Sequence, residues 1–455
     1  MPNCCLMHLS GWGNVPRQPA NVFRPEKWAE LKSIVGQAPS SSLVARGLGR
    51  SYGDAALNDG GGVVLQTHLD RILSFDPQSG LLECEAGVSL ADLLDVFVSR
   101  GFFPPVTPGT KFVTVGGMIA ADVHGKNHHR DGSIAEFVES FELMTAAGEV
   151  LRCSREENTE AFWATLGGMG LTGIIRTARL RLRRIETAYI SADYQRAANL
   201  DEALAMFAKD DQRYAYSVAW IDCLASGESM GRSILMRGNH ATVGELGPRQ
   251  RQKPLVLKPK RKKSVPFNFP SFALSPLTLR LFNNRYYKRS RVGPHIVDYD
   301  TFFYPLDSVL NWNRVYGKRG FFQYQAVFPA SSARECLVEL LGRLSASKRA
   351  SFLAVLKAMG KTSGGMLSFP MPGQTLALDL PNDGPQTTAF LRELDQIVLK
   401  FGGRVYLAKD ACMMPESFRV MYPRLKEFEQ VRARLDPQGR FASSQSRRLG
   451  IGGPA

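Results

Sequence analysis

The stretch that decides the fold is residues 107–133, TPGTKFVTVGGMIAADVHGKNHHRDGS. Its β-branched run Val113-Thr114-Val115 predicts a strand that ends at Gly116-Gly117, before the small residues Met118–Ala121. Glycines at such a turn let backbone amides approach an anion, because no Cβ stands between them and the phosphate oxygens. Just downstream, HGKNHH (residues 124–129) adds titratable and cationic groups. The stretch therefore predicts a phosphate cradle beside a proton-handling cluster, a combination typical of enzymes with a nucleotide cofactor.

A second glycine-rich loop, RGLGRSYGD at residues 46–54, follows the run Ser42–Ala45, which predicts a buried strand. This loop does not fit the dinucleotide fingerprint G-x-G-x-x-G, because Tyr52 stands at the third glycine position and no helix pattern follows. Gly60-Gly61-Gly62 and a further strand, Val63–Leu65, come next instead, and this region has no Walker A motif. Two glycine loops after strands, without that helix, indicate a different phosphate-binding fold.

Four motifs together resemble the vanillyl-alcohol-oxidase superfamily of FAD flavoproteins, in its branch that oxidises polyprenylphosphoryl ribose. The resemblance extends from about Gly11 to Leu449, and the motifs occur in the family's order: RGLGRSYGD, PGT through HGKNHH, FWATLGGMGLTGII (162–175) and YLAKD (406–410). It implies an α+β protein with a PCMH-type FAD-binding domain in two parts and an inserted α+β substrate domain, an antiparallel sheet flanked by helices. The expected bounds are 1–188 for the main FAD part, 189–403 for the substrate domain with a basic membrane-facing segment 249–291, and 404–455 for the C-terminal return.

The local patterns agree with this division. Apolar periodicity predicts helices over Leu90–Ser99, Ala333–Leu344 and Thr388–Phe401, the last of which ends at Gly402-Gly403. Strands are predicted near Leu82–Ala86, Phe141–Thr145, Ile174–Leu182, Phe321–Phe328 and Leu376–Leu380.

The resemblance also implies which residues hold FAD. Relatives that attach FAD covalently use a histidine in the first loop, where this chain has Arg50, so we expect non-covalent FAD. The residues expected at the cofactor are Arg46, Gly47, Leu48, Gly49, Arg50, Ser51, Tyr52, Gly53, Asp54, Gly109, Thr114, Val115, Gly116, Gly117, Asp122, His124, Ile175 and Tyr406.

Oxidation of an alcohol requires a hydride acceptor and a group that takes the hydroxyl proton. By resemblance, the candidates beside the flavin are Lys409, His124 and Tyr52. We expect Lys409 to be essential and His124 to position groups or move protons, and the identity of the base stays open. The alternatives are a salt bridge from Lys409 to the adjacent Asp410 or to another nearby acid, and a structural role for His124.

The substrate residues implied by the resemblance are Lys126, Trp220, Arg314, Gln323, Gln325, Lys357 and Asp379. Gln323 and Gln325 alternate with Tyr324 along a predicted strand, so both face one side. Paired amides suit sugar hydroxyls, which donate and accept hydrogen bonds, although an exposed strand face would show the same pattern. Lys126 and Lys357 are expected to meet a phosphate, and Trp220 is equally consistent with the core or with a sugar platform.

Three positions near this pocket depart from the family pattern. Mycobacterial relatives carry a cysteine where this chain has Ala377, the family's asparagine is Thr375, and a family tyrosine is Phe303. These changes leave the redox chemistry intact but affect the expected identity of the lipid or sugar.

The histidines at 124, 128 and 129 do not predict a metal site. Their H-x-x-x-H-H spacing has no cysteine nearby, and the glycine and lysine between them favour a loop. Seven cysteines form no C-x-x-C pair and no regular framework, which indicates reduced thiols in the cytosol.

Charge is concentrated in one segment. The net charge is +15, and between Leu246 and Val297 there are 13 Lys and Arg and no Asp or Glu, so the rest of the chain is close to neutral. KPKRKK (258–263) precedes the partly apolar FNFPSFALSPLTLRLF (267–282). This combination favours an anionic membrane surface. A solvated loop is the main alternative, and nucleic-acid binding is disfavoured because no binding motif is present.

The sequence has no apolar run of about 18 residues and no secretory signal pattern, so we expect a cytoplasmic protein peripheral to the inner face of the plasma membrane, with a periplasmic place left open. The expected partners are a lipid-linked sugar substrate and a reductase of the short-chain dehydrogenase type, which would complete an epimerisation. Two alternatives are an aldonolactone or alditol oxidase that acts on a soluble sugar, and a flavin-free membrane scaffold.

Overall fold

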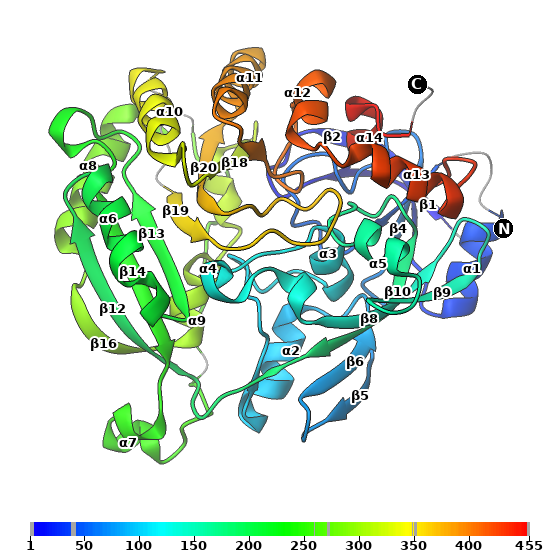
Figure 1. Cartoon of the computed structure of the whole chain (residues 1–455), viewed down its shortest axis with the longest axis horizontal. Coiled ribbons are helices and arrows are strands. Elements are labelled where there is room, and N and C mark those ends of the chain that lie inside the picture. Colours follow the sequence, from blue (N-terminus) through cyan, green and yellow to red (C-terminus); the bar gives the residue numbers. More distant parts are fainter. Residues whose placement is uncertain are drawn as a thin grey trace.

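The computed structural model describes residues 4–37, 42–258, 260–270, 274–347, 349 and 353–452. Residues 259 and 271–273 of the basic segment lie outside this set, as do both ends of the chain. Two sheet-based units lie side by side, and the short helices α3 (Val115–Ala120) and α4 (His128–Asp131) lie between them (Figure 1).

The first unit is built on two sheets. One has the order β1–β2–β4–β3, with β1 antiparallel to β2, and β2 and β3 parallel to β4. The other is antiparallel, with the order β5–β6–β10–β8–β9. The bounds are β1 Cys4–Ser10, β2 Arg17–Phe23, β3 Leu43–Arg46, β4 Gly62–Leu65, β5 Ile72–Asp76, β6 Leu81–Glu85, β8 Val138–Met144, β9 Val150–Ser154, β10 Ile174–Arg181, α1 Trp28–Gln37, α2 Leu90–Phe97 and α5 Thr159–Thr165. A small pair, β7 Phe102–Phe103 and β11 Arg183–Arg184, leads to the second unit.

The second unit is an eight-stranded antiparallel sheet of order β16–β12–β14–β13–β19–β20–β18–β21. Helices α10 and α11 lie over β18 and β20 at the top of Figure 1, and an apolar core fills the space between them. The bounds are β12 Tyr189–Ala197, β13 Tyr216–Ile221, β14 Ser233–His240, β16 Gly293–Asp298, β18 Phe321–Pro329, β19 Ala354–Met359, β20 Gly373–Pro381, β21 Arg404–Val405, α6 Leu200–Asp210, α9 Tyr299–Phe303, α10 Ala333–Ser347 and α11 Pro385–Lys400. The basic segment forms α7 Pro248–Arg251, β15 Lys263–Ser264 and α8 Pro276–Arg289, and β15 pairs with β17 Val309–Leu310.

The C-terminal segment returns to the first unit. Helices α12 (Pro415–Met421), α13 (Leu425–Leu435) and α14 (Ser444–Leu449) pack there, and Phe441 forms a parallel bridge with Leu43 at the edge of β3. Arg448 of α14 donates to Asp54 from Nε (3.0 Å) and Nη2 (2.8 Å), and Nη2 also reaches Asp410 at 2.8 Å. The chain enters the large sheet at residue 189, makes its last strand there at β21 (Arg404–Val405) and then returns to the first unit. We propose the units 1–188, 189–403 and 404–455, with β21 as the contact between the last two.

One predicted element is wrong. Val113–Val115 is not a strand: Thr114 is the N-cap of α3, and its side chain accepts a hydrogen bond from the Gly117 amide. The β-branched pattern of the run therefore yields to capping, since an N-cap residue has the same extended backbone as a strand residue. The loop predicted from Gly125 and Lys126 is confirmed, and the one-turn helix α4 begins after it, at His128. No helix among the described residues has the length and apolar character needed to cross a bilayer.

Candidate active site

Three backbone segments meet at the centre of the molecule. A Cβ on Gly47 would lie 2.2 Å from Thr114 Oγ1, so the first glycine loop touches the entry to α3. A Cβ on Gly53 would lie 1.9 Å from the Asp410 carbonyl oxygen, so the same loop also touches the turn that carries Lys409. The Tyr52 amide donates to the carbonyl of Ala408 at 3.0 Å. Both glycines are therefore required by close approach, and together they place three of the four sequence motifs in one site.

One face of the large sheet supplies the polar side of this site. The register aligns Gln323 with Asp379, and Gln325 with Ala377, Val355 and Trp220 in turn. Tyr324 faces the opposite side, where it packs in the core under α10 and α11. The predicted shared orientation of Gln323 and Gln325 is confirmed, and neither lies on an exposed strand face.

His124 is held in a buried network. Its Nε2 lies 3.1 Å from Gln325 Nε2, and its Nδ1 lies 3.2 Å from Lys357 Nζ. Gln325 also donates to Thr375 Oγ1 at 3.3 Å. Burial, with the charges of Lys357, His128 and Lys409, holds the pKa of His124 well below its usual range. A neutral imidazole has one N–H, so one ring nitrogen donates and the other accepts, and the ring links the protonation of Lys357 to the orientation of the Gln325 amide.

A second network surrounds Lys409. Its Nζ lies 4.0 Å from the centre of the Tyr52 ring. Burial lowers the pKa of Lys409 to about 7; the charge of Asp379 opposes this shift, and that of Lys357 adds to it. Asp379 accepts from Gln323 Nε2 at 2.6 Å and from the Tyr316 hydroxyl at 3.1 Å, and burial raises its pKa to about 7. Lys409 and Asp379 therefore both change charge near neutral pH.

Lys409 and Asp410 have separate environments, because the Asp410 carboxylate pairs with Arg448 and accepts from the amides of Cys412 and Met413. Tyr52 stays protonated at neutral pH, since burial raises its pKa well above 10.

Two further lysines are partly buried without a compensating charge. Lys126 donates to the Phe302 carbonyl and lies 4.6 Å from that ring's centre. Burial, with the charge of Lys357, lowers its pKa to about 7, and burial lowers the pKa of Lys357 to about 8. No carboxylate of the described residues forms an ion pair with either lysine. Two partly buried cations that repel each other provide a site for an anion.

The other candidate substrate residues occupy different environments. Trp220 is buried in the same sheet row as Gln325, and its ring lies 4.8 Å from that of Tyr286 in α8. Arg314 does not join the networks: its Nη1 donates to the carbonyls of Val265 and Pro266 at 3.1 Å each and thereby holds the basic segment. His128 accepts from the Gly360 amide, and His129 contacts the Tyr214 carbonyl.

The residues expected at the cofactor fall into two groups. Some offer backbone amides on the glycine loops, and others have side chains that hold those loops in place. Arg46 donates to the carbonyls of Ser10 and Ala56, and the guanidinium of Arg50 lies 4.0 Å above the Trp12 ring. Asp122 is buried at φ 40°, with its Oδ2 unpaired. Tyr406 donates to the Ala121 carbonyl at 2.8 Å, whereas Gly109 is exposed. The side chains of Arg46, Asp54 and Tyr406 therefore bond to other parts of the protein and hold the glycine loops in position.

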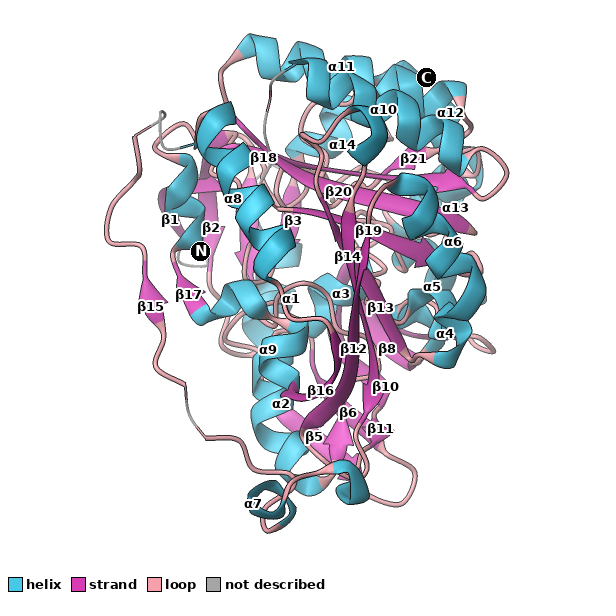
Figure 2. Ribbon diagram, turned by 90° about the vertical axis from the view of Figure 1, so that its left-hand side faces the viewer, coloured by secondary structure: helices cyan, strands magenta, loops and turns pink. Residues whose placement is uncertain are grey.

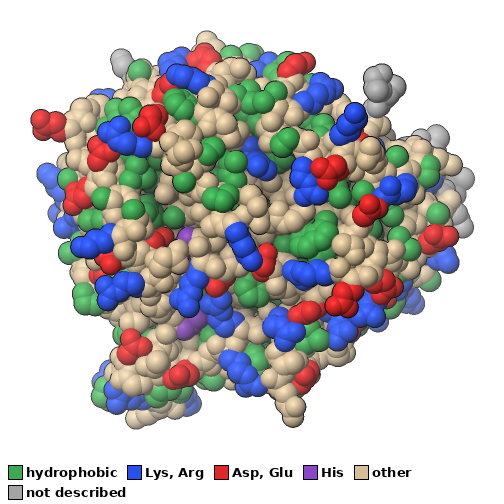
Figure 3. All heavy atoms as spheres, viewed as in Figure 1, with side chains coloured by type: hydrophobic (Ala, Val, Ile, Leu, Met, Phe, Trp, Pro, Cys, Tyr) green, Lys and Arg blue, Asp and Glu red, His purple; other side chains and the backbone are tan. Residues whose placement is uncertain are grey.

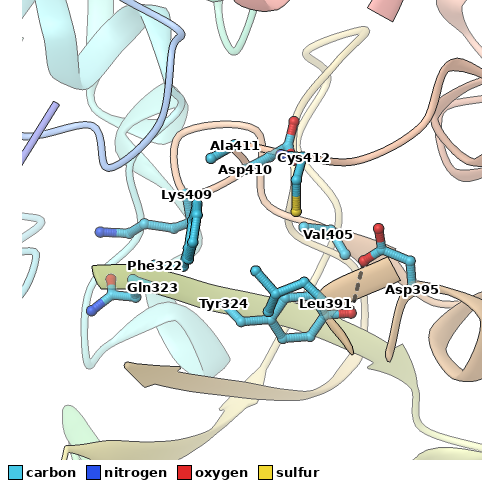
Figure 4. Close-up of a pocket in the computed structure, with 10 residues that line it drawn as sticks. All are labelled: Phe322, Gln323, Tyr324, Leu391, Asp395, Val405, Lys409, Asp410, Ala411 and Cys412. Atoms are coloured by element: carbon cyan, nitrogen blue, oxygen red, sulfur yellow. Dashed lines mark hydrogen bonds between the residues drawn. The ribbon is translucent and has the colours of Figure 1, made fainter. Parts of the chain in front are cut away.

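No sequence pattern indicated two buried groups near Lys409: Tyr316 and the Tyr324–Asp395 pair. Tyr316 bonds to Asp379, as described above. Tyr324 donates to Asp395 at 3.0 Å beside a cavity of about 10 Å³, room for about one water. In Figure 4, Lys409 and Gln323 point away from this pair, so the cavity lies behind the site rather than in it. Burial raises the pKa of Asp395 to about 8, which keeps that carboxyl largely protonated.

Comparison with known proteins gives the family. Residues 19–154 match the FAD binding domain, and residues 375–449 match D-arabinono-1,4-lactone oxidase. The decaprenylphosphoryl-beta-D-ribose oxidase of Mycolicibacterium smegmatis is 39% identical over 447 residues, with 97% of each chain covered. This chain belongs to that family of FAD-dependent oxidases. More distant relatives are the L-gulono-1,4-lactone dehydrogenase of Mycobacterium tuberculosis (24% over 447 residues, 96% of this chain and 98% of that one) and the L-gulonolactone oxidase of Mus musculus (24% over 451 residues, 94% of each).

The loops of this oxidase fit FAD. Within the described part of the chain, the amides of Leu48, Gly49 and Arg50 donate to no protein acceptor, which leaves donors for phosphate oxygens on the loop that touches Thr114. Bound FAD supplies the hydride acceptor of the oxidase family. The loop amides would hold its pyrophosphate, while Lys409, His124 and Tyr52 converge beside the glycine loops.

Gly47→Ala should lower the FAD content of the purified oxidase. The added Cβ would meet Thr114 Oγ1 at 2.2 Å, displacing either the cap of α3 or the first loop. The ratio of flavin to protein absorbance measures the loss. Gly36→Ala is the matched control, since nothing lies within 4 Å of its added Cβ. Equal flavin content in the two variants would contradict the claim that the contact between Gly47 and Thr114 supports FAD binding.

The rate of flavin reduction should rise with pH through an inflection near 7, because neutral Lys409 accepts a proton. Asp379→Asn should move the inflection to lower pH, since the carboxylate that raises the Lys409 pKa is removed. Lys409→Met should slow reduction by about 100-fold or more and abolish the inflection. Anaerobic stopped-flow absorbance across pH measures both effects. Lys209→Met, at an exposed lysine, is the control, and an unchanged inflection in the Asp379 variant would count against the coupling.

Proposed function

We propose that this protein oxidises the 2′-hydroxyl of a polyprenylphosphoryl-β-D-ribose to the 2-keto product. The observation that carries this proposal is the pair of partly buried lysines, Lys126 and Lys357, which have no carboxylate partner among the described residues. A neutral lactone would leave their repulsion in place, whereas the phosphodiester of a lipid-linked sugar would offset it and return both pKa values toward their usual range. The name of the 39% identical relative states a substrate of this class.

The sugar would lie between the glutamine face of the sheet and Lys409. Gln323 and Gln325 offer amides to its hydroxyls, and Asp379 fixes the Gln323 amide by accepting from it. Lys409, with a pKa of about 7, is our proposed acceptor of the hydroxyl proton, because a base with a pKa near the working pH is most effective. Neutral His124 would hold Gln325 and Lys357 in position, and Tyr52 would remain a protonated donor.

The 2-keto product requires a second enzyme to become the epimer. The oxidation removes a hydride and a proton from the ribose carbon and its hydroxyl, and reduction must return both to the opposite face of that carbon. We propose a separate NAD(P)H-dependent reductase of the short-chain dehydrogenase type for this step, which would give the arabinose donor for cell-wall polysaccharide.

The prenyl tail of such a substrate resides in a membrane. We therefore propose that the protein works at the inner face of the plasma membrane, with the basic segment 249–291 toward the lipid. Figure 3 shows Asp and Glu side chains among Lys and Arg over most of its face, in contrast to the acid-free run between Leu246 and Val297.

Oxidation of a soluble aldonolactone or alditol is the second candidate. It is favoured by the match of residues 375–449 to D-arabinono-1,4-lactone oxidase and by the full-length relatives at 24% identity. The flavin-free scaffold does not fit a member of an FAD-dependent oxidase family.

The flavin should be released by acid precipitation. Arg50 stands where relatives carry the histidine for covalent attachment, and its side chain lies over Trp12. Yellow colour in the supernatant after precipitation and centrifugation would support non-covalent FAD. Flavin that stays with the pellet would overturn it.

Under anaerobic conditions, polyprenylphosphoryl ribose should bleach the oxidised flavin band, whereas free ribose and aldonolactones should not. Lys126→Met and Lys357→Met should each raise the apparent KM for the lipid-linked sugar, since the anion loses a cation. Dithionite reduction of each variant controls for an intact flavin site. Bleaching by lactones alone would assign the protein to the soluble-sugar oxidases instead.

A further inference from the structure

Helix α8 presents an unusual surface for a protein in water. Leu277 is 68% exposed, Leu281 is 63% exposed and Phe282 is 46% exposed. Leu277 and Leu281 are one turn apart, so they form one ridge along the helix. Eight of the 18 exposed large apolar side chains in the described residues lie between positions 256 and 310, which concentrates this character in and around the basic segment.

Polar anchors hold α8 from beneath, so its outward face is not an effect of fraying. Asn283 is buried and donates to Asp222 Oδ1 at 2.8 Å, and the Tyr287 hydroxyl donates to the Ala197 carbonyl at 3.3 Å. Arg196 Nε returns a bond to the Tyr287 carbonyl at 2.8 Å. In Figure 2, α8 crosses the side of the molecule that faces the viewer, and no other helix or strand lies over it.

The charges on α8 specify the partner. Arg280, Arg285, Lys288 and Arg289 are exposed, and none forms an ion pair with a carboxylate of the described residues. Apolar side chains among unpaired cations match the two layers of an anionic bilayer, acyl chains and phosphate headgroups. A protein partner of the usual kind would instead bury a ridge with few charges at its centre.

An aromatic path leads from α8 to the catalytic face. The Phe282 and Tyr286 rings are stacked with centres 6.0 Å apart, and the Tyr286 and Trp220 rings are 4.8 Å apart. Trp220 stands in the sheet row that ends at Gln325, the partner of His124. The outward face of α8 is therefore linked through Tyr286 and Trp220 to the face of the sheet on which Gln325 lies.

We propose that α8 inserts its Leu277–Leu281 ridge, with Phe282 beside it, into an anionic lipid bilayer, which brings the membrane that holds the substrate's prenyl chain to the side of the sheet on which Trp220 and Gln325 lie. The proposal rests on the proposed function for its substrate, but lipid binding by α8 is measured without any substrate.

The test is co-sedimentation of the full-length FAD-loaded protein with vesicles of phosphatidylglycerol and phosphatidylcholine, compared with phosphatidylcholine alone. Wild type should bind the anionic vesicles and bind neutral vesicles weakly. The double variant Leu277→Ser, Leu281→Ser should weaken binding to anionic vesicles about tenfold or more, because two large apolar side chains no longer enter the lipid. Leu6→Ser, Val420→Ser is the matched control, at two apolar side chains that are 71% and 70% exposed elsewhere, and it should bind as wild type.

Equal vesicle binding by the two double variants would overturn the proposal. So would a change in solution mass caused by the α8 substitutions with vesicle binding unchanged, since the ridge would then contact a second copy of the chain.

Flavin reduction by a short-chain, water-soluble prenylphosphoryl ribose separates the two hypotheses. It should be normal in the α8 variant, which also shows that the variant is folded. Absence of this reaction in wild type would refute the proposed function, whereas loss of vesicle binding alone bears on α8.

Discussion

The whole site depends on three backbone segments that approach more closely than side chains allow. Gly47 lies against Thr114 and Gly53 against the Asp410 carbonyl, so the first loop is in contact with both the second loop and the turn of Lys409. This approach leaves the amides of Leu48, Gly49 and Arg50 without acceptors among the described residues, so they are available to a ligand. The same packing carries Tyr52 to within 4.0 Å of Lys409, so cofactor binding and catalysis share one constraint.

The site also holds three lysines whose positive charge is only partly offset by carboxylates. Lys126, Lys357 and Lys409 each have a pKa lowered to between about 7 and about 8, and Asp379 is the acid that acts on Lys409. Burial therefore brings the pKa of each lysine close to neutral pH, so that each can gain or lose a proton there instead of staying charged. A lysine that exchanges protons at neutral pH serves as an acid or base, and one that becomes fully charged when an anion arrives serves recognition. Neutral His124, between Lys357 and Gln325, connects the two roles.

The sequence predicted what depends on local pattern and on family motifs. The strands at Ser42–Ala45 and Phe321–Phe328, the helix after Thr388 and the common face of Gln323 and Gln325 followed from periodicity, and the structure confirms them. Thr114 was assigned to a strand because a capping residue and a strand residue share a backbone conformation. Arg314 and Tyr316 lie in one short 3-10 helix, yet Arg314 holds the basic segment while Tyr316 reaches Asp379. Such a difference arises from tertiary packing, so no local pattern encodes it.

The return of the C-terminal segment has a consequence for synthesis. Lys409, Asp410 and Arg448 all lie in the last fifty or so residues of the chain. The bridge in which Arg448 binds both Asp54 and Asp410 therefore forms only after those residues have been made. The bridge at the edge of β3 likewise needs Phe441, which lies almost 400 residues after its partner Leu43. On the ribosome the inserted sheet, whose strands lie almost entirely between residues 189 and 381, can form before the C-terminal helices of the flavin unit have been made. A chain cut short near its end would therefore have a folded substrate sheet beside an incomplete FAD site. FAD binding would then depend on an intact C-terminal segment.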